Sequence, residues 1–400
     1  MNFTKNICYI IVILSFPLQF VFHNLFYSYG VPSIQKNWDM SHVSKTQLDV
    51  ANIITKYCAA FSPLAFIFIS YKIKKLRKFM SILFFIGGVI FLLYLPINEH
   101  IVWFIIILRI LNGILVGFFM SATIAYLMHY SINGIHGFNG SLIEVAITLG
   151  ICITELMFYV IPWKIVGVLF SVQSFLFGGL IWLVPEYFVI PKSLSHDYIY
   201  RKPFLKNLLI MILIMIIQCF SGIGFMINNC ARLLSGIGIE LHSSIQSTLT
   251  NFISCLSAFI SAFIIDVVSA RYMWAFSSLG IVISLLIYDI TLKIECPKWV
   301  GVFAVFLYFL FFGLGEGTIP WMLCGLIFPE SLMIESGSIN TFVNRFMDAW
   351  FDHLLNLISK SLGEFGSVAF NACITFFGIW VGLYFIPKMN ISTEDKITII

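Results

Sequence analysis

PEYFVIPKSLSHDYIYRKPFLK, residues 185–206, is the clearest polar interruption in an otherwise apolar chain of 400 residues. Each side of it holds six stretches of about 20 mostly apolar residues, the length that one transmembrane helix requires. We therefore predict an all-α membrane protein of about twelve transmembrane helices in two halves, residues 1–184 and 207–400, with 185–206 as a cytoplasmic linker. The predicted spans are residues 6–30, 47–71, 78–97, 101–128, 138–161, 164–184, 206–233, 245–268, 272–292, 299–327, 339–361 and 367–387.

Composition supports the membrane assignment and excludes other classes of protein. The chain is 60% hydrophobic and only 10% charged, with a mean hydropathy of +0.97. Soluble domains carry roughly 25% charged residues, so no soluble domain is expected. No metalloprotease, nucleophile-elbow or nucleotide-loop motif occurs, and the nine cysteines show no metal spacing. We expect no enzyme activity, no cofactor and no bound metal.

Positive charge predicts how the chain is oriented in the membrane. With the N-terminus inside, the inside segments hold thirteen Lys and Arg residues and the outside loops hold seven. Both termini are therefore predicted to be cytoplasmic, in the plasma membrane or, alternatively, in an organelle membrane. The net charge of +4 follows from this bias, so no nucleic-acid partner is expected.

The two halves share a pattern of spacing. The basic segment KIKKLRK (72–78) joins the second and third spans, and VVSARYM (267–273) joins the eighth and ninth. Each segment has the same place within its own half, as expected for a duplicated six-helix unit. This spacing favours the major facilitator architecture. The competing bundle-type transporter fold would need two Gly-broken helices at matching positions, and none is seen.

Several ionisable residues fall inside predicted spans, where each costs at least about 2.5–3.5 kcal/mol on insertion scales. Arg345 and Asp348 are three residues apart on one helix face, so they can neutralise each other. Glu144 has no basic neighbour on its own helix, which favours a functional role. Arg109 lies beside Asn112 and is either a structural anchor or functional. The full set is Arg109, Glu144, Glu155, Glu316, Arg345, Asp348 and Asp352.

The tenth span has an unusual cluster of helix-weakening residues, FFGLGEGTIPW. Gly313, Gly315, Gly317 and Pro320 reduce helical hydrogen bonding in mid-membrane. A flexible break followed by Trp321 is suited to a gate over a central site. The alternative explanation is close helix packing alone.

Several motifs stand in the order and on the helices of one transporter family. GEGTIPW (315–321), followed by Phe328-Pro329, is similar to G-x-G-P-I-P-W…F-P. QCFSGI (218–223) is similar to Q-Q-x-S-G-I-N, and SLIEVAITLGI (141–151) to S-x-x-Q-x-x-I-T-x-G-I. The chain resembles the sugar porter family of the major facilitator superfamily, over most of its length.

The resemblance implies a hexose or a related sugar as substrate, moved by alternating access through a monomeric unit. Amide groups suit a neutral polyol because each offers both a donor and an acceptor. At matching positions, Arg109, Gly315, Gly317 and Pro320 would serve gating or structure. The implied substrate-binding residues are Gln218, Trp321, Asn344, Glu144, Asp348 and Asn228.

Departures from the family pattern allow substrates other than sugars. Cys219 replaces a second glutamine, and carboxylates at Glu144 and Asp348 replace amides. An organic cation, an amino acid or a nucleoside is therefore an alternative substrate, and a non-transporting solute sensor is a second alternative.

The residues implied in gating and energy coupling also differ. The family's cytoplasmic charges, which latch the outward-facing state, are replaced by His129, His136, Leu326 and Met333, so a different gating balance is expected. Ser28 stands where proton-driven members have an acid, which favours facilitative transport. Glu144 is an alternative proton carrier.

Overall fold

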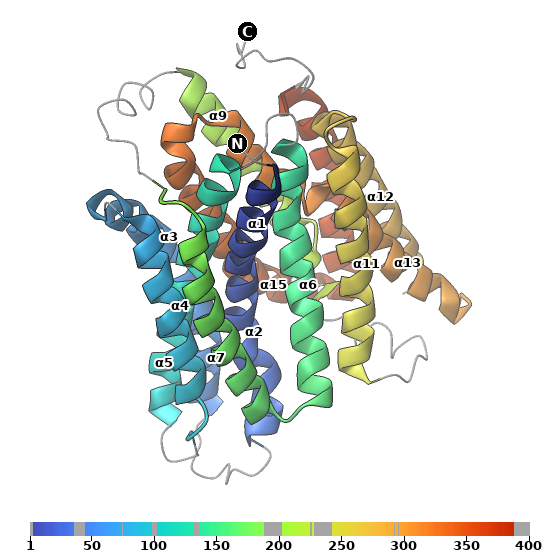
Figure 1. Cartoon of the computed structure of the whole chain (residues 1–400). Coiled ribbons are helices and arrows are strands. Elements are labelled where there is room, and N and C mark those ends of the chain that lie inside the picture. The colour runs from blue at the N-terminus through green and yellow to red at the C-terminus, as the bar shows by residue number, and fades with distance from the viewer. Residues whose placement is uncertain are drawn as a thin grey trace.

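The computed structural model shows a bundle of helices that run roughly side by side (Figure 1). Among the described residues no strand occurs, so the all-α prediction is confirmed. The described residues are 3–35, 45–73, 75–97, 102–130, 136–187, 202–224, 226–227, 242–291, 293–294 and 296–387. The helices of the first half are α1 (Phe3–Ile13), α2 (Ser15–Gln35), α3 (Lys45–Lys72), α4 (Leu76–Leu93), α5 (Val102–His129), α6 (His136–Val160), α7 (Trp163–Leu180) and η3 (Ile181–Leu183). Those of the second half are α9 (Lys202–Phe220), α11 (Ser243–Ile264), α12 (Ala270–Thr291), α13 (Lys298–Phe311), η4 (Phe312–Glu316), α14 (Ile319–Ile327), η5 (Glu330–Leu332) and α15 (Met333–Phe385).

Each predicted membrane span contains at least one helix of the structure. Ten segments of the described chain are long and apolar enough to cross a bilayer, and Phe204–Phe220 is a shorter apolar helix. The 53-residue helix α15 bends at Gly363, whose φ of 73° and ψ of −174° are not helical. Its two arms therefore correspond to the predicted spans 339–361 and 367–387. Large apolar side chains on the outside, such as Phe68 and Val160 at 68% and 71% exposure, suit a surface that faces lipid.

Three spans contain breaks. The first is divided into α1 and α2, where the Ser15 hydroxyl donates to the Val12 carbonyl at 2.6 Å. The seventh, predicted as continuous over 206–233, has its α-helix end at Phe220. Gly222 follows with a φ of 99°, and any Cβ there would lie 2.5 Å from the Asn371 amide. The tenth contains the π-helix η4, so the predicted weakening of its helical hydrogen bonds is confirmed.

Two pairs of helices bring the halves together. Helix α6 packs along α11, and α3 packs along α15. Residues far apart in sequence thereby line one central space.

Candidate functional site

A cavity of about 1030 Å³ lies between the two halves. Its wall includes side chains from α2, α6, α11, α14 and α15. Of the predicted substrate-binding residues, it brings together Glu144, Gln218, Trp321, Asn344 and Asp348. Asn228 lies outside the described residues, so its predicted role stays a prediction.

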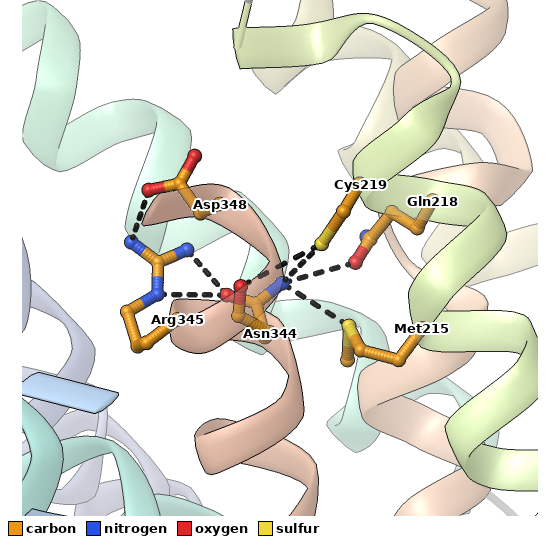
Figure 2. Close-up of polar contacts among 6 residues, drawn as sticks. All are labelled: Met215, Gln218, Cys219, Asn344, Arg345 and Asp348. Carbon is orange, nitrogen blue, oxygen red and sulfur yellow. Dashed lines mark hydrogen bonds and ion pairs between the residues drawn. The ribbon is translucent and has the colours of Figure 1, made fainter. Parts of the chain in front are cut away.

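Gln218 and Asn344 form a hydrogen-bonded centre between α9 and α15 (Figure 2). The Asn344 amide donates to Gln218 Oε1 at 3.3 Å, and Gln218 Nε2 donates to the backbone carbonyls of Glu316 and Gly317 at 2.8 and 3.2 Å. The Gln218 amide therefore holds the end of η4 and the residue after it beside α9. Its carbonyl oxygen keeps one acceptor position for a hydroxyl group.

Arg345 and Asp348 form the predicted ion pair, with 3.6 Å between Nη1 and Oδ2. Arg345 Nε also donates to Asn344 Oδ1 at 2.8 Å, and Nη2 of the same guanidinium reaches that oxygen. The guanidinium lies 5.0 Å from the centre of the Phe20 ring on α2, so it contacts both halves. Because the pair is internally neutralised, the Asp348 carboxylate does not present an isolated negative charge to the cavity.

Glu144 and Trp321 face each other across the two halves. The Trp321 indole of α14 lies beside the Glu144 carboxyl group of α6. Gly317 lies close by, since a Cβ there would be only 3.1 Å from Glu144 Oε1. An apolar ring beside a carboxylate suits a sugar, which has apolar faces and hydroxyl edges.

The residues assigned to gating or structure occupy different positions. Arg109 is 3% exposed, lines the cavity, donates from Nε to the Ala51 carbonyl at 2.9 Å and lies 4.8 Å from the Tyr27 ring centre. Gly315 lies against α12, where a Cβ would be 2.8 Å from the Met273 carbonyl. Pro320 is in the first turn of α14. Roles for these residues in gating stay predictions.

A polar face of α11 was not predicted from the sequence. Ser244, Ser247, Asn251 and Ser254 line the cavity at spacings of three and four residues. This is the period of one helix face, and three of the four residues lie inside the predicted span 245–268. The face begins near His242, just before α11, and leads toward the middle of the bundle.

Contacts between the halves close the opposite end of α6 and α11. Asp266, after α11, accepts hydrogen bonds from the backbone N–H groups of Gly137 and Phe138, both at 2.9 Å. A carboxylate at a helix N-terminus satisfies orphan donors and complements the helix dipole. A Cβ on residue 137 would lie 2.3 Å from Asp266 Oδ1, so any larger residue would push this carboxylate out of its position.

A second contact between the halves lies at the same end. His129, the last residue of α5, pairs through Nδ1 with Glu330 of η5. Its ring also lies 5.0 Å from that of Tyr187, where burial and then the Glu330 charge raise the pKa of the phenol. We call the Asp266 and His129 contacts together the inter-half clasp. Residues 129, 326 and 333 depart from the family pattern, but this end still has polar contacts between the halves.

Comparison with known proteins agrees with this architecture. Residues 192–400 match the family described as "Sugar (and other) transporter". The chain belongs to this family. Together with the spans, this makes the protein an integral, multi-pass membrane protein.

The facilitated trehalose transporter of Drosophila sechellia is 24% identical to this chain over 200 residues, which are 48% of this chain and 23% of that protein. The facilitated trehalose transporter of Bombyx mori is 21% identical over 206 residues, 50% of this chain and 41% of that protein. The chain thus matches less than half the length of these relatives.

Solved structures show the same fold over nearly the whole chain. The proton:xylose symporter XylE bound to 6-bromo-6-deoxy-D-glucose superposes with a TM-score of 0.79 at 15% identity, covering 98% of each chain. The transporter FucP in its outward conformation gives a TM-score of 0.73 at 13% identity, covering 96% of this chain and 100% of that one. The major facilitator fold is confirmed.

Proposed function

We propose that the transporter carries a small neutral sugar across a membrane by alternating access, with the sugar held beside Trp321, Gln218 and Asn344. The observation that carries this proposal is the cavity between the halves. Its wall extends from these residues to Tyr159 and His242, near the end of α6 and the start of α11. The inter-half clasp lies at the other end of these two helices, so the arrangement fits a conformer closed at the clasp end.

The charges of the site favour a neutral substrate over a cation. Asp348 is paired with Arg345, and Glu144 lies beside the Trp321 indole. Trehalose is the first sugar to test because several relatives are named trehalose transporters, and xylose is the second. A thermal-shift screen of sugars, polyols, organic cations, amino acids and nucleosides separates the alternatives. Binding of a sugar without any flux would instead indicate a sensor.

We also propose the orientation and the organisation that the sequence predicts. Both termini are cytoplasmic in this proposal, so the clasp closes the cytoplasmic end and the cavity leads outward. The plasma membrane is the proposed location, one chain is the transport unit, and residues 1–184 and 207–400 are the moving halves. Protease accessibility of tags on the two termini in intact cells tests the orientation.

Gln218→Ala is expected to lower the initial rate of sugar uptake into proteoliposomes about tenfold. The change removes the hydrogen bonds to Asn344 and to two carbonyls of the tenth span, and tenfold corresponds to about 1.4 kcal/mol. The matched control is Gln173→Ala, since Gln173 bonds Gln19 at 2.5 Å and does not line the cavity. Equal uptake by wild type and Gln218→Ala would contradict the role of Gln218.

A further inference from the structure

Two carboxyl groups lie on one face of α6, beside the cavity. Glu144 and Glu155 are eleven residues apart, which is close to three helical turns, or about 16 Å along the axis. Glu144 is 6% exposed and Glu155 is fully buried. Glu144 belongs to the candidate sugar site, whereas Glu155 does not.

Glu155 is held by donors from both halves. Tyr29 on α2 and Ser247 on α11 donate hydroxyl groups to Oε1, each at 2.5 Å, and Asn251 Nδ2 lies 3.5 Å from the same oxygen. The other oxygen, Oε2, has no hydrogen-bond partner among the described residues. Within that part of the chain, no Lys or Arg forms an ion pair with this carboxyl group.

These surroundings fully stabilise neither the charged nor the neutral form of Glu155. Three donors on Oε1 stabilise the carboxylate anion, whereas burial without a cation stabilises the neutral acid. A proton on Oε2 would in turn find no acceptor among the described residues. A carboxyl group balanced in this way is suited to gaining and losing a proton as its surroundings change.

The titratable groups around the two acids differ. Tyr29 of α2 and Cys152 of α6 face Glu155, and the α11 residues that contact it carry no charge. Glu144 faces Arg345 of α15 and Cys255 of α11. Among the described residues, the charge of Arg345 therefore acts on Glu144, whereas no cation faces Glu155.

One cavity links the two acids. Tyr29, Ser247 and Asn251, the partners of Glu155, line it, as do Thr148 and Glu144 itself. Polar side chains of one cavity wall therefore extend from the partners of Glu155 to Glu144.

We propose that Glu155 and Glu144 form a proton site that couples sugar movement to proton movement in the same direction. Glu155 takes a proton from water at the end away from the clasp, Glu144 holds it beside Trp321, and the proton leaves with the sugar on the other side. The proposal rests on the proposed sugar transport. In this proposal the proton-binding acids lie on α6, because position 28 on α2 is a serine.

Sugar-driven proton uptake tests the proposal. Proteoliposomes containing a trapped pH-sensitive dye receive the sugar that wild type exchanges in counterflow, with no initial pH difference. Wild type should acidify the lumen on sugar addition. Glu155→Gln should reduce the acidification at least tenfold and keep the rate of sugar exchange within about twofold. Asp289→Asn is the matched control, because Asp289 is a buried acid of α12 that does not line the cavity and should keep wild-type acidification.

The outcomes separate this inference from the transport proposal. Sugar exchange without acidification by wild type would overturn the proton site and leave sugar transport standing. Equal acidification by Glu155→Gln and wild type would also overturn it. Absence of exchange for every sugar would overturn both proposals. If Glu155→Gln does not fold, Tyr29→Phe removes one donor from the same oxygen, and an unchanged pH profile of uptake would count against the site.

Discussion

Trp321→Ala is expected to weaken sugar binding roughly thirtyfold, or about 2 kcal/mol, the typical loss for a buried aromatic anchor. The substitution removes the ring that lines the cavity and also the indole N–H beside Glu144. Trp321→Phe should have a smaller effect because it keeps a ring and loses only the donor. Isothermal titration with purified protein measures both losses.

A suitable control is a tryptophan on the outer surface. Trp380 of α15 is 49% exposed and stacks on Tyr384, away from the cavity. Trp380→Ala should bind sugar like wild type. If Trp321→Ala binds as tightly as this control, the ring does not contact the sugar and the proposed site is wrong.

Gly137→Val is expected to shift the equilibrium between conformers roughly thirtyfold toward the state that is open at the clasp end. The side chain would displace the Asp266 carboxylate, whose two hydrogen bonds from the α6 N-terminus have a net value of about 2 kcal/mol. Asp266→Asn should give a smaller shift, since an amide keeps one acceptor oxygen. Pulsed electron paramagnetic resonance between spin labels at the exposed positions Lys75 and Val267, in a cysteine-free background, should show the longer distance gaining population.

The size of this effect also depends on the second contact of the clasp. His129→Ala alone should shift the distances less than Gly137→Val, because His129 and Glu330 are 34% and 55% exposed and solvent screens their pair. An unchanged distance distribution in Gly137→Val would show that the clasp does not hold this end closed.

The sequence predicted the fold well because hydropathy and spacing are local signals. The twelve spans, the pairing of Arg345 with Asp348 and the weak tenth helix all depend on neighbours within a few residues. The break at Gly222 was missed because an apolar run gives no sign of a residue whose space is occupied by Asn371.

The clasp was missed for a different reason. Asp266 and Gly137 are 129 residues apart, and only the folded bundle brings a helix end and a carboxylate together. The family pattern places charges at the positions of Leu326 and Met333, whereas the acid that pairs with His129 is Glu330. The amides at Gln218 and Asn344 were predicted as ligands, but their bonds to each other appear only in three dimensions.

Counterflow is the most direct measurement of the central claim that a sugar passes through this cavity. Proteoliposomes are loaded with a high concentration of unlabelled hexose or disaccharide and diluted into a trace of the same labelled sugar. We predict transient accumulation of label with wild type and with Trp380→Ala, and little with Trp321→Ala. No accumulation by wild type with any sugar, or equal accumulation by Trp321→Ala, would contradict the proposed function or the proposed site, respectively.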